Sequence, residues 1–591
     1  MHGYSRTLLA GLLCSSALLS ACGSDNNPAA PVIIPPLGVS ATPTSVSTIR
    51  VAFSSNAGDT GYELERAEGA AGTFALATTI PAPAVAGALT YDDVNLKVNT
   101  LYRYRVTAVR GTRKSLPSGE SNATTFNFGG NQTIDVTGDI TTNTTWRAEN
   151  VYLLKGFIHV ANSATLTIQP GTTIKGDFAT LGASLFILRG AKINAVGTAS
   201  APIVFTSSRA AGQRQAGDWG GLIIIGNATT ARTNVEITLE GTGTNTASGN
   251  PPGTNYKLTY NGGTVDTDDS GTLSYVRVEF AGYAPSANEE LNSFTFATVG
   301  SGTRMSFLQT LAGLDDSYEW FGGTVDANNL VSYDAGDDHF DMSEGYRGRL
   351  KNLIALQTRA YGAGDIRTGA GSASSDPQGI ENDGCPATAS GCTQGQNTAP
   401  FTIPIVANFT LIGTGDAASS GSSGGVGLMI RRGSGGYYVN GLVARWSRAA
   451  ASIRDVETYQ RAGNVPTPDL ATSDLALRNN LFVETPTVFQ SGGSSVQNSF
   501  DLVGNALTVA AGTTTASLFT AFPATVSATT AVAAFDWTPP AGSAATTGGL
   551  AVFTGKLSTV AGTSVTGTSY RGAADPAGAK WWQGWTAYAR N

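Results

Sequence analysis

The chain has 591 residues, which is too long for one compact core, so we expect several domains or an elongated repeat. Its net charge is −7, only 13% of its residues are charged, and no cluster of Lys or Arg forms a stripe, which argues against a nucleic-acid partner. Short runs of alternating apolar residues, broken by Gly, Asn and Asp, recur throughout and predict a nearly all-β chain.

Residues 1–21 have the features of a secretion signal, with an apolar run from Leu8 to Leu19 that is too short to span a bilayer. The run ends in Leu19-Ser20-Ala21-Cys22, which resembles the bacterial lipobox. The resemblance implies cleavage before Cys22 and lipidation of Cys22, so that acyl chains hold the protein on a membrane. An ordinary secretory signal with a chance cysteine is the alternative. Because Gly23 stands at the second position of the expected mature chain, where an Asp would signal inner-membrane retention, we expect the outer membrane, on its periplasmic face or at the cell surface.

Residues 22–36 are polar and then Pro-rich, which is typical of an extended, here lipidated, tether. Residues 37–126 follow as several short strand candidates without cysteines, and they predict a small antiparallel sandwich. The segments 61–66, 91–93 and 99–106 resemble a fibronectin type III domain. The resemblance implies that Tyr102 is the tyrosine-corner residue and that this domain is a spacer or a binding platform.

Residues 127–591 contain apolar triplets that recur at a nearly constant spacing. The runs that begin at Met305, Asn329 and Asn352 follow one another at about 23–24 residues, a plausible coil length for a parallel β-solenoid. Gly and Asn would make the turns because they tolerate left-handed backbone conformations, and inward Asn side chains would form ladders. One or several large sandwiches are the alternative.

Family resemblance leads to the same architecture. The segments 165–176, 190–198, 201–207 and 217–222 resemble bacterial cell-surface proteins with a right-handed parallel β-helix of the pectin-lyase-like superfamily. The segments 315–325 and 336–341 resemble the central part of a widespread group of such lipoproteins. The expected fold is therefore all-β, with a fibronectin type III sandwich followed by a long right-handed parallel β-helix. The resemblance implies architecture rather than chemistry, because the superfamily includes lyases, hydrolases, adhesins and scaffolds.

Two cysteines remain in the expected mature chain besides Cys22. Cys385 and Cys392 enclose six residues, among them Pro386 and Gly391, and can close a disulfide in an oxidising compartment. A metal-binding pair is the alternative, although no His or third Cys lies nearby.

Acidic residues concentrate in one stretch of a chain that is otherwise poor in charge. Asp315 and Asp316 lie about one coil before Asp337 and Asp338, so the four carboxylates should stack and would repel one another without a hard cation such as Ca²⁺. A solvated acidic edge, with each Asp capping its own turn, is the alternative. The whole cluster contains Asp315, Asp316, Glu319, Asp326, Asp334, Asp337, Asp338 and Asp341.

No catalytic residue is assigned. Arg347, Arg349 and Lys351 lie just after the acidic cluster, and Arg431 and Arg432 lie further on, but they match no lyase motif. His159 and His339 are the only histidines after the signal, and we expect the acids around His339 to raise its pKa.

Two further segments carry side chains suited to recognition. Residues 376–383 are either a projecting recognition loop or part of a Gly/Ser-rich insertion. The aromatic residues of 581–588 would cap the open end of the solenoid, with stacking on sugar rings as the alternative.

The expected function is that of a surface-anchored lipoprotein that acts as a non-enzymatic binding, adhesive or structural scaffold. Its expected partners are a membrane, through the N-terminal lipid, and a glycan or a cell-surface protein, with ligand-binding residues unknown. The alternative is a Ca²⁺-dependent polysaccharide lyase or a glycosidase that acts through an acidic groove near residues 315–351.

Overall fold

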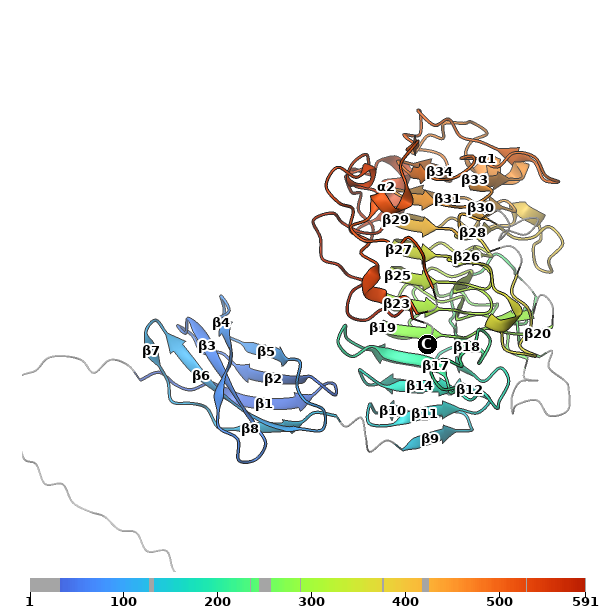
Figure 1. The fold of residues 1–591 in the computed structure, drawn as a ribbon. Coiled ribbons are helices and arrows are strands. Elements are labelled where there is room, and N and C mark those ends of the chain that lie inside the picture. Colours follow the sequence, from blue (N-terminus) through green and yellow to red (C-terminus); the bar gives the residue numbers. More distant parts are fainter. Residues whose placement is uncertain are drawn as a thin grey trace, which may run out of the picture. The chain divides into compact units, whose positions relative to one another are not determined.

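A computed structural model describes residues 32–126, 132–233, 235–243, 257–286, 289–374, 377–416, 425–527 and 529–589. The described chain is all-β, as predicted, apart from short 3₁₀ turns and two short helices, α1 (Val456–Arg461) and α2 (Gly555–Ala561) (Figure 1). None of the described helices is long and apolar enough to cross a membrane. The predicted signal and Cys22, the predicted lipidation site, lie outside the described residues.

The N-terminal strands form two sheets, one of three strands in the order β1-β2-β5 and one of five strands, in which β4-β3-β6-β7 are neighbours and β8 also pairs with β6. The strands are β1 (Leu37–Pro43), β2 (Ile49–Ser54), β3 (Gly61–Glu68), β4 (Ala75–Pro81), β5 (Ala88–Asp93), β6 (Leu101–Arg110), β7 (Arg113–Lys114) and β8 (Ser121–Thr124). Alternation along β6 follows the sequence pattern, because Tyr102, Tyr104, Val106 and Ala108 are buried. The Tyr102 hydroxyl accepts a hydrogen bond from the Lys97 backbone N–H at 2.9 Å, which is the geometry of a tyrosine corner.

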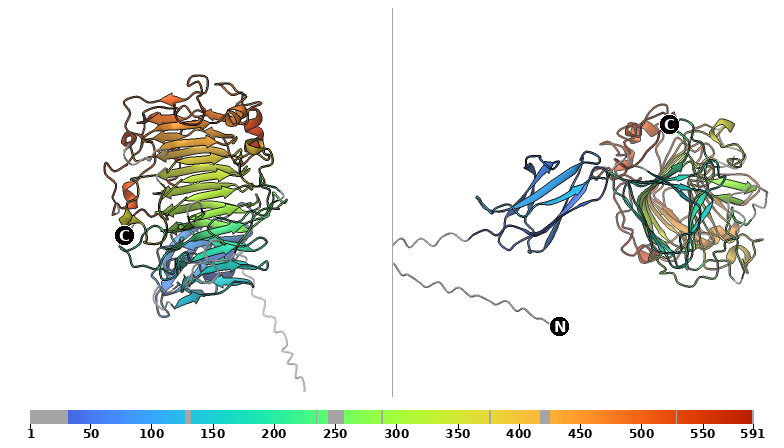
Figure 2. Two further views of the ribbon diagram at one scale, coloured as in Figure 1. Left: turned by 90° about the vertical axis from the view of Figure 1, so that its right-hand side faces the viewer. Right: turned by 90° about the horizontal axis from the view of Figure 1, so that it is seen from below.

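Residues from 132 onward form a stack of coils in which parallel strands make two long sheets (Figures 1 and 2). The 17-stranded sheet contains β9 (Thr133–Val136), β10 (Thr144–Trp146), β11 (Val151–Leu154), β13 (Thr165–Ile168), β14 (Thr173–Gly176), β16 (Lys192–Val196), β17 (Ile203–Ser207), β19 (Gly271–Glu279), β23 (Arg304–Leu311), β25 (Ala327–Tyr333), β27 (Arg349–Leu356), β29 (Ile405–Ile412), β31 (Gly436–Val439), β32 (Leu442–Ala444), β34 (Leu475–Arg478), β35 (Leu481–Val483) and β37 (Thr508–Val509). The 10-stranded sheet contains β12 (Phe157–Val160), β15 (Ser184–Ile187), β18 (Gly221–Ile225), β22 (Phe294–Ala297), β24 (Tyr318–Phe321), β26 (Phe340–Ser343), β28 (Ile380–Asp383), β30 (Val426–Arg431), β33 (Ala449–Arg454) and β36 (Gln497–Asn498). A hairpin of β20 (Tyr283–Ser286) and β21 (Glu289–Leu291) projects from the stack.

The coil repeat is short in the middle of the stack and is lengthened elsewhere by insertions. Met305 pairs with Ala327 and Ala327 pairs with Leu350, so the repeat here is close to the predicted length. Leu350 next pairs with Val406, because the coil between them is lengthened by insertions on both sides of β28. A further insertion separates β18 from β19. Residues of these insertions contribute side chains to the outer face of the 10-stranded sheet.

The recurring Asn residues stand at one corner of successive coils. Asn329, Asn352, Asn408 and Asn440 have left-handed backbone conformations with φ of 59°, 59°, 55° and 59°, as expected for turns. The expected ladder between inward Asn side chains is wrong for two of them. The Nδ2 groups of Asn408 and Asn440 instead donate to the Thr568 hydroxyl at 2.8 and 3.1 Å, so they hold a distant segment of the chain.

That distant segment is the C-terminal strap, which we define as residues 510–589 without residue 528. Figure 1 shows it in orange and red, beside the strands of the 17-stranded sheet. It does not cap the open end of the stack, so this expectation is wrong. The physical reason is a column of outward apolar side chains on successive strands, which water would otherwise contact and which the strap buries. The column includes Leu311, Tyr333, Leu356, Ile412, Ala444 and Val483.

The strap is held by aromatic packing and by polar contacts. Trp585 is fully buried and its ring lies edge-on to Tyr275 and Phe307, with ring centroids 5.7 and 6.1 Å away. The side chain of Gln309 pairs with the backbone of Ala587, whose N–H donates to Gln309 Oε1 at 2.8 Å. Because Trp582, Trp585 and Tyr588 are all buried, they offer no ring face to a sugar.

The predicted disulfide is present between Cys385 and Cys392, with 5.7 Å between their Cα atoms. The loop that it closes is also held from outside. Arg232 donates to the Ser390 carbonyl oxygen at 2.8 Å and forms an ion pair with Glu344 at 2.7 Å. The bridge therefore belongs to the wall that the insertions build beside the stack.

The strap predicts a strong effect of Trp585→Ala. Removal of this ring leaves a cavity between the strap and the sheet, and we expect it to lower the free energy of unfolding by about 3 kcal/mol. All eight tryptophans lie beyond residue 132, so urea unfolding followed by tryptophan fluorescence reports on this part of the chain. Trp581→Ala, at a partly exposed ring, is the control and should lower the free energy of unfolding by a smaller amount. An equal and small decrease in the free energy of unfolding of both variants would contradict the packing of Trp585 between the strap and the sheet.

Candidate functional site

An acidic groove of about 440 Å³ lies on the outer face of the 10-stranded sheet. Among the residues that the structure describes, nine carboxylic acids and one arginine line it, together with Ser372 and Ser374 from the insertion after β27. The acids are Glu240, Glu290, Asp315, Asp316, Glu319, Asp337, Asp338, Asp341 and Glu381. A chain with so few charged residues therefore places about a fifth of its acids at one point.

Strand register builds the floor of the groove. Glu319 of β24 pairs with Asp341 of β26, which pairs with Glu381 of β28, so the three side chains form one column. Neighbouring strands are about 4.8 Å apart, and this spacing brings like charges close together. The alternation along β24 explains the direction of Glu319, since Tyr318 and Trp320 on either side of it belong to the apolar core.

The turns before these strands carry a second set of carboxylates with a structural task. The Asp316 Oδ1 atom accepts a hydrogen bond from the Asp338 backbone N–H at 2.8 Å, and Asp338 Oδ1 accepts one from the Gln378 N–H. The Gln378 Oε1 atom continues the series, because it accepts from the Val426 N–H at 3.0 Å. Each side chain thus accepts a hydrogen bond from the turn of the next coil, and we call this series the turn ladder. The second carboxylate oxygen of each Asp takes no part in the turn ladder.

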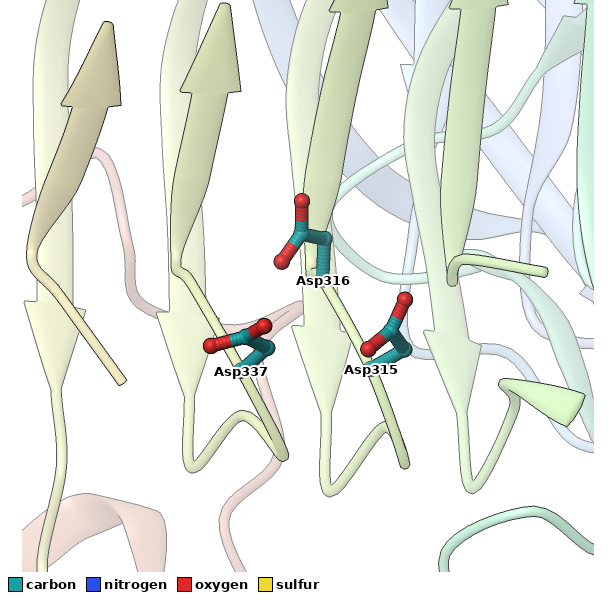
Figure 3. A group of neighbouring side chains, drawn as sticks. All are labelled: Asp315, Asp316 and Asp337. Atoms are coloured by element: carbon teal, nitrogen blue, oxygen red, sulfur yellow. The ribbon is translucent and has the colours of Figure 1, made fainter. Parts of the chain in front are cut away.

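The carboxylate oxygens form three groups whose members lie within 4.8 Å of one another. Asp315, Asp316 and Asp337 make the first group, and Figure 3 shows the three side chains close together on adjacent coils. The other groups are Asp316 with Glu319 and Asp341, and Asp338 with Asp341 and Glu381. Two ligands on opposite sides of a Ca²⁺ ion are also about 4.8 Å apart, because each Ca–O bond is about 2.4 Å. The donor set therefore fits a hard cation.

The electrostatics of the groove oppose full ionisation. Burial, followed by repulsion from neighbouring carboxylates, raises the pKa of Glu240 and of Glu381 to about 8. The same two causes raise the pKa of Asp316, Asp338 and Asp341 well above the usual range. Protons or a bound cation must therefore compensate these acids at neutral pH.

The arginine of the groove is Arg431 of β30, which forms ion pairs with Glu381 and, at 2.7 Å, with Asp383. Burial alone would lower its pKa, but the two carboxylates outweigh this and raise the pKa of Arg431 above its usual value. Arg432 also pairs with Asp383. The Arg431 guanidinium is therefore a fixed cation that neutralises one end of the groove.

The basic residues that follow the acidic cluster in sequence are not in the groove. Arg347 pairs with Asp266 at 3.1 Å, and Arg349 pairs with Asp326 at 3.0 Å. Arg349 and Lys351 belong to β27 of the other sheet. The expected groove near residues 315–351 thus has acids from this stretch, whereas the arginine among its described lining residues comes from a later coil.

His339 is a second correction. It is fully buried, and burial lowers the pKa of His339 to about 4 instead of neighbouring acids raising it. Its Nδ1 lies 2.6 Å from the Ser332 hydroxyl oxygen inside the stack. The reason is that Asp338 faces the groove, whereas the His339 ring faces the interior, where its centroid lies 6.3 Å from that of the Trp446 ring.

The groove combines acids that the sequence connects with acids that it does not. All four predicted metal ligands line it, and these are Asp315, Asp316, Asp337 and Asp338. Glu240 and Glu290 come from the insertion after β18 and from the hairpin, and no periodicity relates them to the coils. Much of the wall therefore has no signal in the sequence.

Two other expectations about acidic residues need correction. The sequence predicts a loop at residues 376–383, whereas residues 380–383 are strand β28, and Asp376 lies outside the described residues. Asp326 and Asp334 belong to the same cluster in sequence but lie away from the groove. Asp326 pairs with Arg349, and Asp334 accepts from the Thr358 hydroxyl at 2.8 Å.

Several solved structures match a small share of this chain. An Fn3-like protein from Clostridium thermocellum is 24% identical and covers 15% of this chain and 88% of its own, with a TM-score of 0.14. The protein FN3tt is 23% identical and covers 16% of this chain and 92% of its own, with a TM-score of 0.13. Domains A168-A170 of titin are also 23% identical, over 16% of this chain and 33% of their own, with a TM-score of 0.14.

A comparison with the curated proteins finds no match. The model of the family described as the pectate-lyase-like beta helix domain matches residues 138–523, which is more than half of the chain. This range contains most of both long sheets and every acid of the groove. The chain therefore belongs to the pectate-lyase-like beta-helix family.

Proposed function

We propose that this protein is a surface-anchored lipoprotein whose β-helix binds a glycan, without turnover, through Ca²⁺ held in the acidic groove. The observation that carries the proposal is the convergence of nine carboxyl groups on one cavity, with one arginine among its described lining residues. Such a groove repels the carboxylates of an acidic glycan unless a cation intervenes. A hard cation with six to eight oxygen ligands could take some ligands from the protein and others from a sugar.

The chemistry of the neighbouring groups favours binding over catalysis. A lyase needs a base that removes a proton, and Arg431 is held in its charged form by Glu381 and Asp383. Arg347 and Arg349 have acid partners away from the groove, and His339 is enclosed by the core. These contacts support a scaffold and count against the lyase alternative.

The Ca²⁺ proposal predicts a change in the pH dependence of stability. In Ca²⁺-free buffer Glu240 and Glu381 keep their protons in the folded state up to about pH 8, whereas in the unfolded state they lose them near pH 4.5. The folded state then binds more protons, so its stability should fall as the pH rises from about 4.5 to 8. Ca²⁺ should reverse this loss, by about 2.7 kcal/mol when its concentration is 100 times its Kd.

The measurement is the melting temperature at pH 5 and pH 8, with Ca²⁺ and with a chelator. Asp316→Asn combined with Asp341→Asn removes at least one carboxylate from each of the three carboxylate groups and should abolish the effect of Ca²⁺ on the melting temperature. The amide introduced at position 316 keeps an Oδ1 acceptor for the Asp338 N–H, so the turn ladder is retained. Asp135→Asn, at an exposed acid paired with Lys155, is the control and should respond to Ca²⁺ like the wild type. Identical melting curves with Ca²⁺ and chelator at pH 8 would refute the cation site.

Glycan binding and turnover are tested on the same polymers, polygalacturonate and alginate. We expect Ca²⁺-dependent retention on the immobilised polymers, with no unsaturated uronates by ultraviolet absorbance and no new reducing ends. Retention should be lost in the Asp316→Asn, Asp341→Asn variant. The lyase alternative would prevail if uronates were released with Ca²⁺ and Arg431→Lys abolished the release. Failure to retain either polymer would remove the glycan from the proposal.

The anchor rests on the Leu19-Ser20-Ala21-Cys22 segment. Acyl chains on Cys22 and the tether of residues 22–36 would carry the folded domains from the outer membrane. Replacement Cys22→Ser should abolish labelling with radioactive palmitate and release the protein from membranes. Ser20→Ala, which leaves the cysteine in place, should label like the wild type. Labelling that persists in Cys22→Ser would exclude this anchor.

A further inference from the structure

A second cleft, of about 430 Å³, lies on the outer face of the 17-stranded sheet. Strands β23, β25 and β27 form its floor, and Ser564 and Val565 of the C-terminal strap form one side. The cleft shares no lining residue with the acidic groove among the residues that the structure describes. Its volume exceeds that of a single small ion and is within the range of ligand pockets.

Strand register arranges the floor in two columns. Met305 pairs with Ala327 and Ala327 with Leu350, so the residues before and after them also lie side by side on the three coils. Both columns face outward, since Met305, Ala327 and Leu350 belong to the apolar core. The first column consists of Arg304, Asp326 and Arg349, and the second of Ser306, Asn328 and Lys351. The floor therefore presents three cations, one carboxylate and two neutral polar groups.

Two of the three cations also hold the strap. Arg349 pairs with Asp326 at 3.0 Å and its Nη1 lies 3.4 Å from the Ala561 carbonyl oxygen of the strap. The Lys351 ammonium reaches the Thr566 hydroxyl at 3.2 Å and has no carboxylate partner among the described residues. Lys351 thus contributes a positive charge to the cleft that no acid of the described chain pairs with.

Arg304 is the third cation and has no structural task of this kind. Its side chain is exposed and makes no hydrogen bond or ion pair with any residue that the structure describes. The positive charge of Arg304 helps to lower the pKa of Asp269. The Asp269 carboxylate, however, is already paired with Lys192 at 2.7 Å. The guanidinium of Arg304 is therefore available to a ligand.

Excess positive charge in a recess is the setting in which anions bind. The Asp326 carboxylate compensates one of the three cations, which leaves two positive charges beside hydroxyl and amide donors. Burial lowers the pKa of Lys351, as expected for an ammonium without a counter-ion. A bound oxyanion would supply that counter-ion, and Arg304 is able to bind it with two parallel N–H groups.

We propose that this cleft is an anion-binding site in which Arg304, Lys351 and Arg349 hold the oxyanion of a small ligand, as a phosphate, sulfate or carboxylate group. The site is separate from the acidic groove and needs no Ca²⁺. Ser306 and Asn328 belong to the same floor and offer hydrogen bonds to the rest of the ligand. The strap completes the site, because Ser564 and Val565 form one of its walls.

Isothermal titration of the full chain in Ca²⁺-free buffer tests the proposal. The probes are inorganic phosphate, inorganic sulfate, glucose 6-phosphate and glucuronate, with glucose as the neutral control. We expect at least one anionic probe to bind, more weakly as NaCl is raised, and glucose not to bind. The comparison among the probes shows whether a free ion or a sugar-borne group is preferred.

Variants separate binding from a purely structural role. Arg304→Gln should weaken binding of the probe about tenfold, since it removes one charge-assisted contact without touching the strap, and Arg304→Lys should retain most of the affinity. Lys351→Met should weaken binding to a similar extent. Because this change also removes the hydrogen bond to Thr566, the melting temperature of the variant is measured as well. The Asp316→Asn, Asp341→Asn variant should bind like the wild type. No binding of any anion, or unchanged affinity in Arg304→Gln, would overturn the proposal.

Discussion

The pairing of each coil with the next is the constraint on which the rest of this structure depends. Backbone hydrogen bonds between parallel strands impose one register, and where the repeat is nearly constant that register aligns side chains in columns. A column repeats whatever chemistry the sequence places at that spacing. Apolar columns facing inward form the core, and their repetition allows a long domain without a thicker core.

Outward columns need other means to shield their apolar surface or to balance their charge, and this chain uses three of them. The apolar column from Leu311 to Val483 is covered by the strap, a long and mostly irregular segment. In the mixed column, Asp326 neutralises part of the positive charge. Among the described residues, the acidic column that ends at Glu381 has no apolar cover, Arg431 offsets only part of its charge, and the insertions bring two further acids toward it. That contrast supports the role proposed for the acidic column, since stability alone does not favour stacked like charges.

The coil spacing makes some of these contacts predictable from sequence and leaves others without a signal. Asp316 and Asp338 are one repeat apart, and their stacking follows from that distance and from the turn positions of both residues. Glu381 could not be aligned with Asp341 in the same way, because the insertion before β28 breaks the spacing. The sequence neighbours of His339 include acids that face the groove, but its ring is buried beside Trp446, so the sequence predicts its pKa shift in the wrong direction. The path of the strap has no local signal at all, since Trp585 packs on side chains that lie far away in the sequence.

The raised pKa values in the groove connect fold stability with occupancy. Glu240 and Glu381, with pKa values of about 8, are protonated through most of the neutral range, so protons already compensate part of the charge that a cation would compensate. A cation must therefore displace protons, and its affinity should rise with pH over the same interval in which the empty groove becomes less stable. Under the proposed function, the groove would exchange protons for a divalent ion. The turn ladder through Asp316 and Asp338 is compatible with either state, because it uses Oδ1 atoms, which accept hydrogen bonds whether the second oxygen is protonated, ionised or bound to metal.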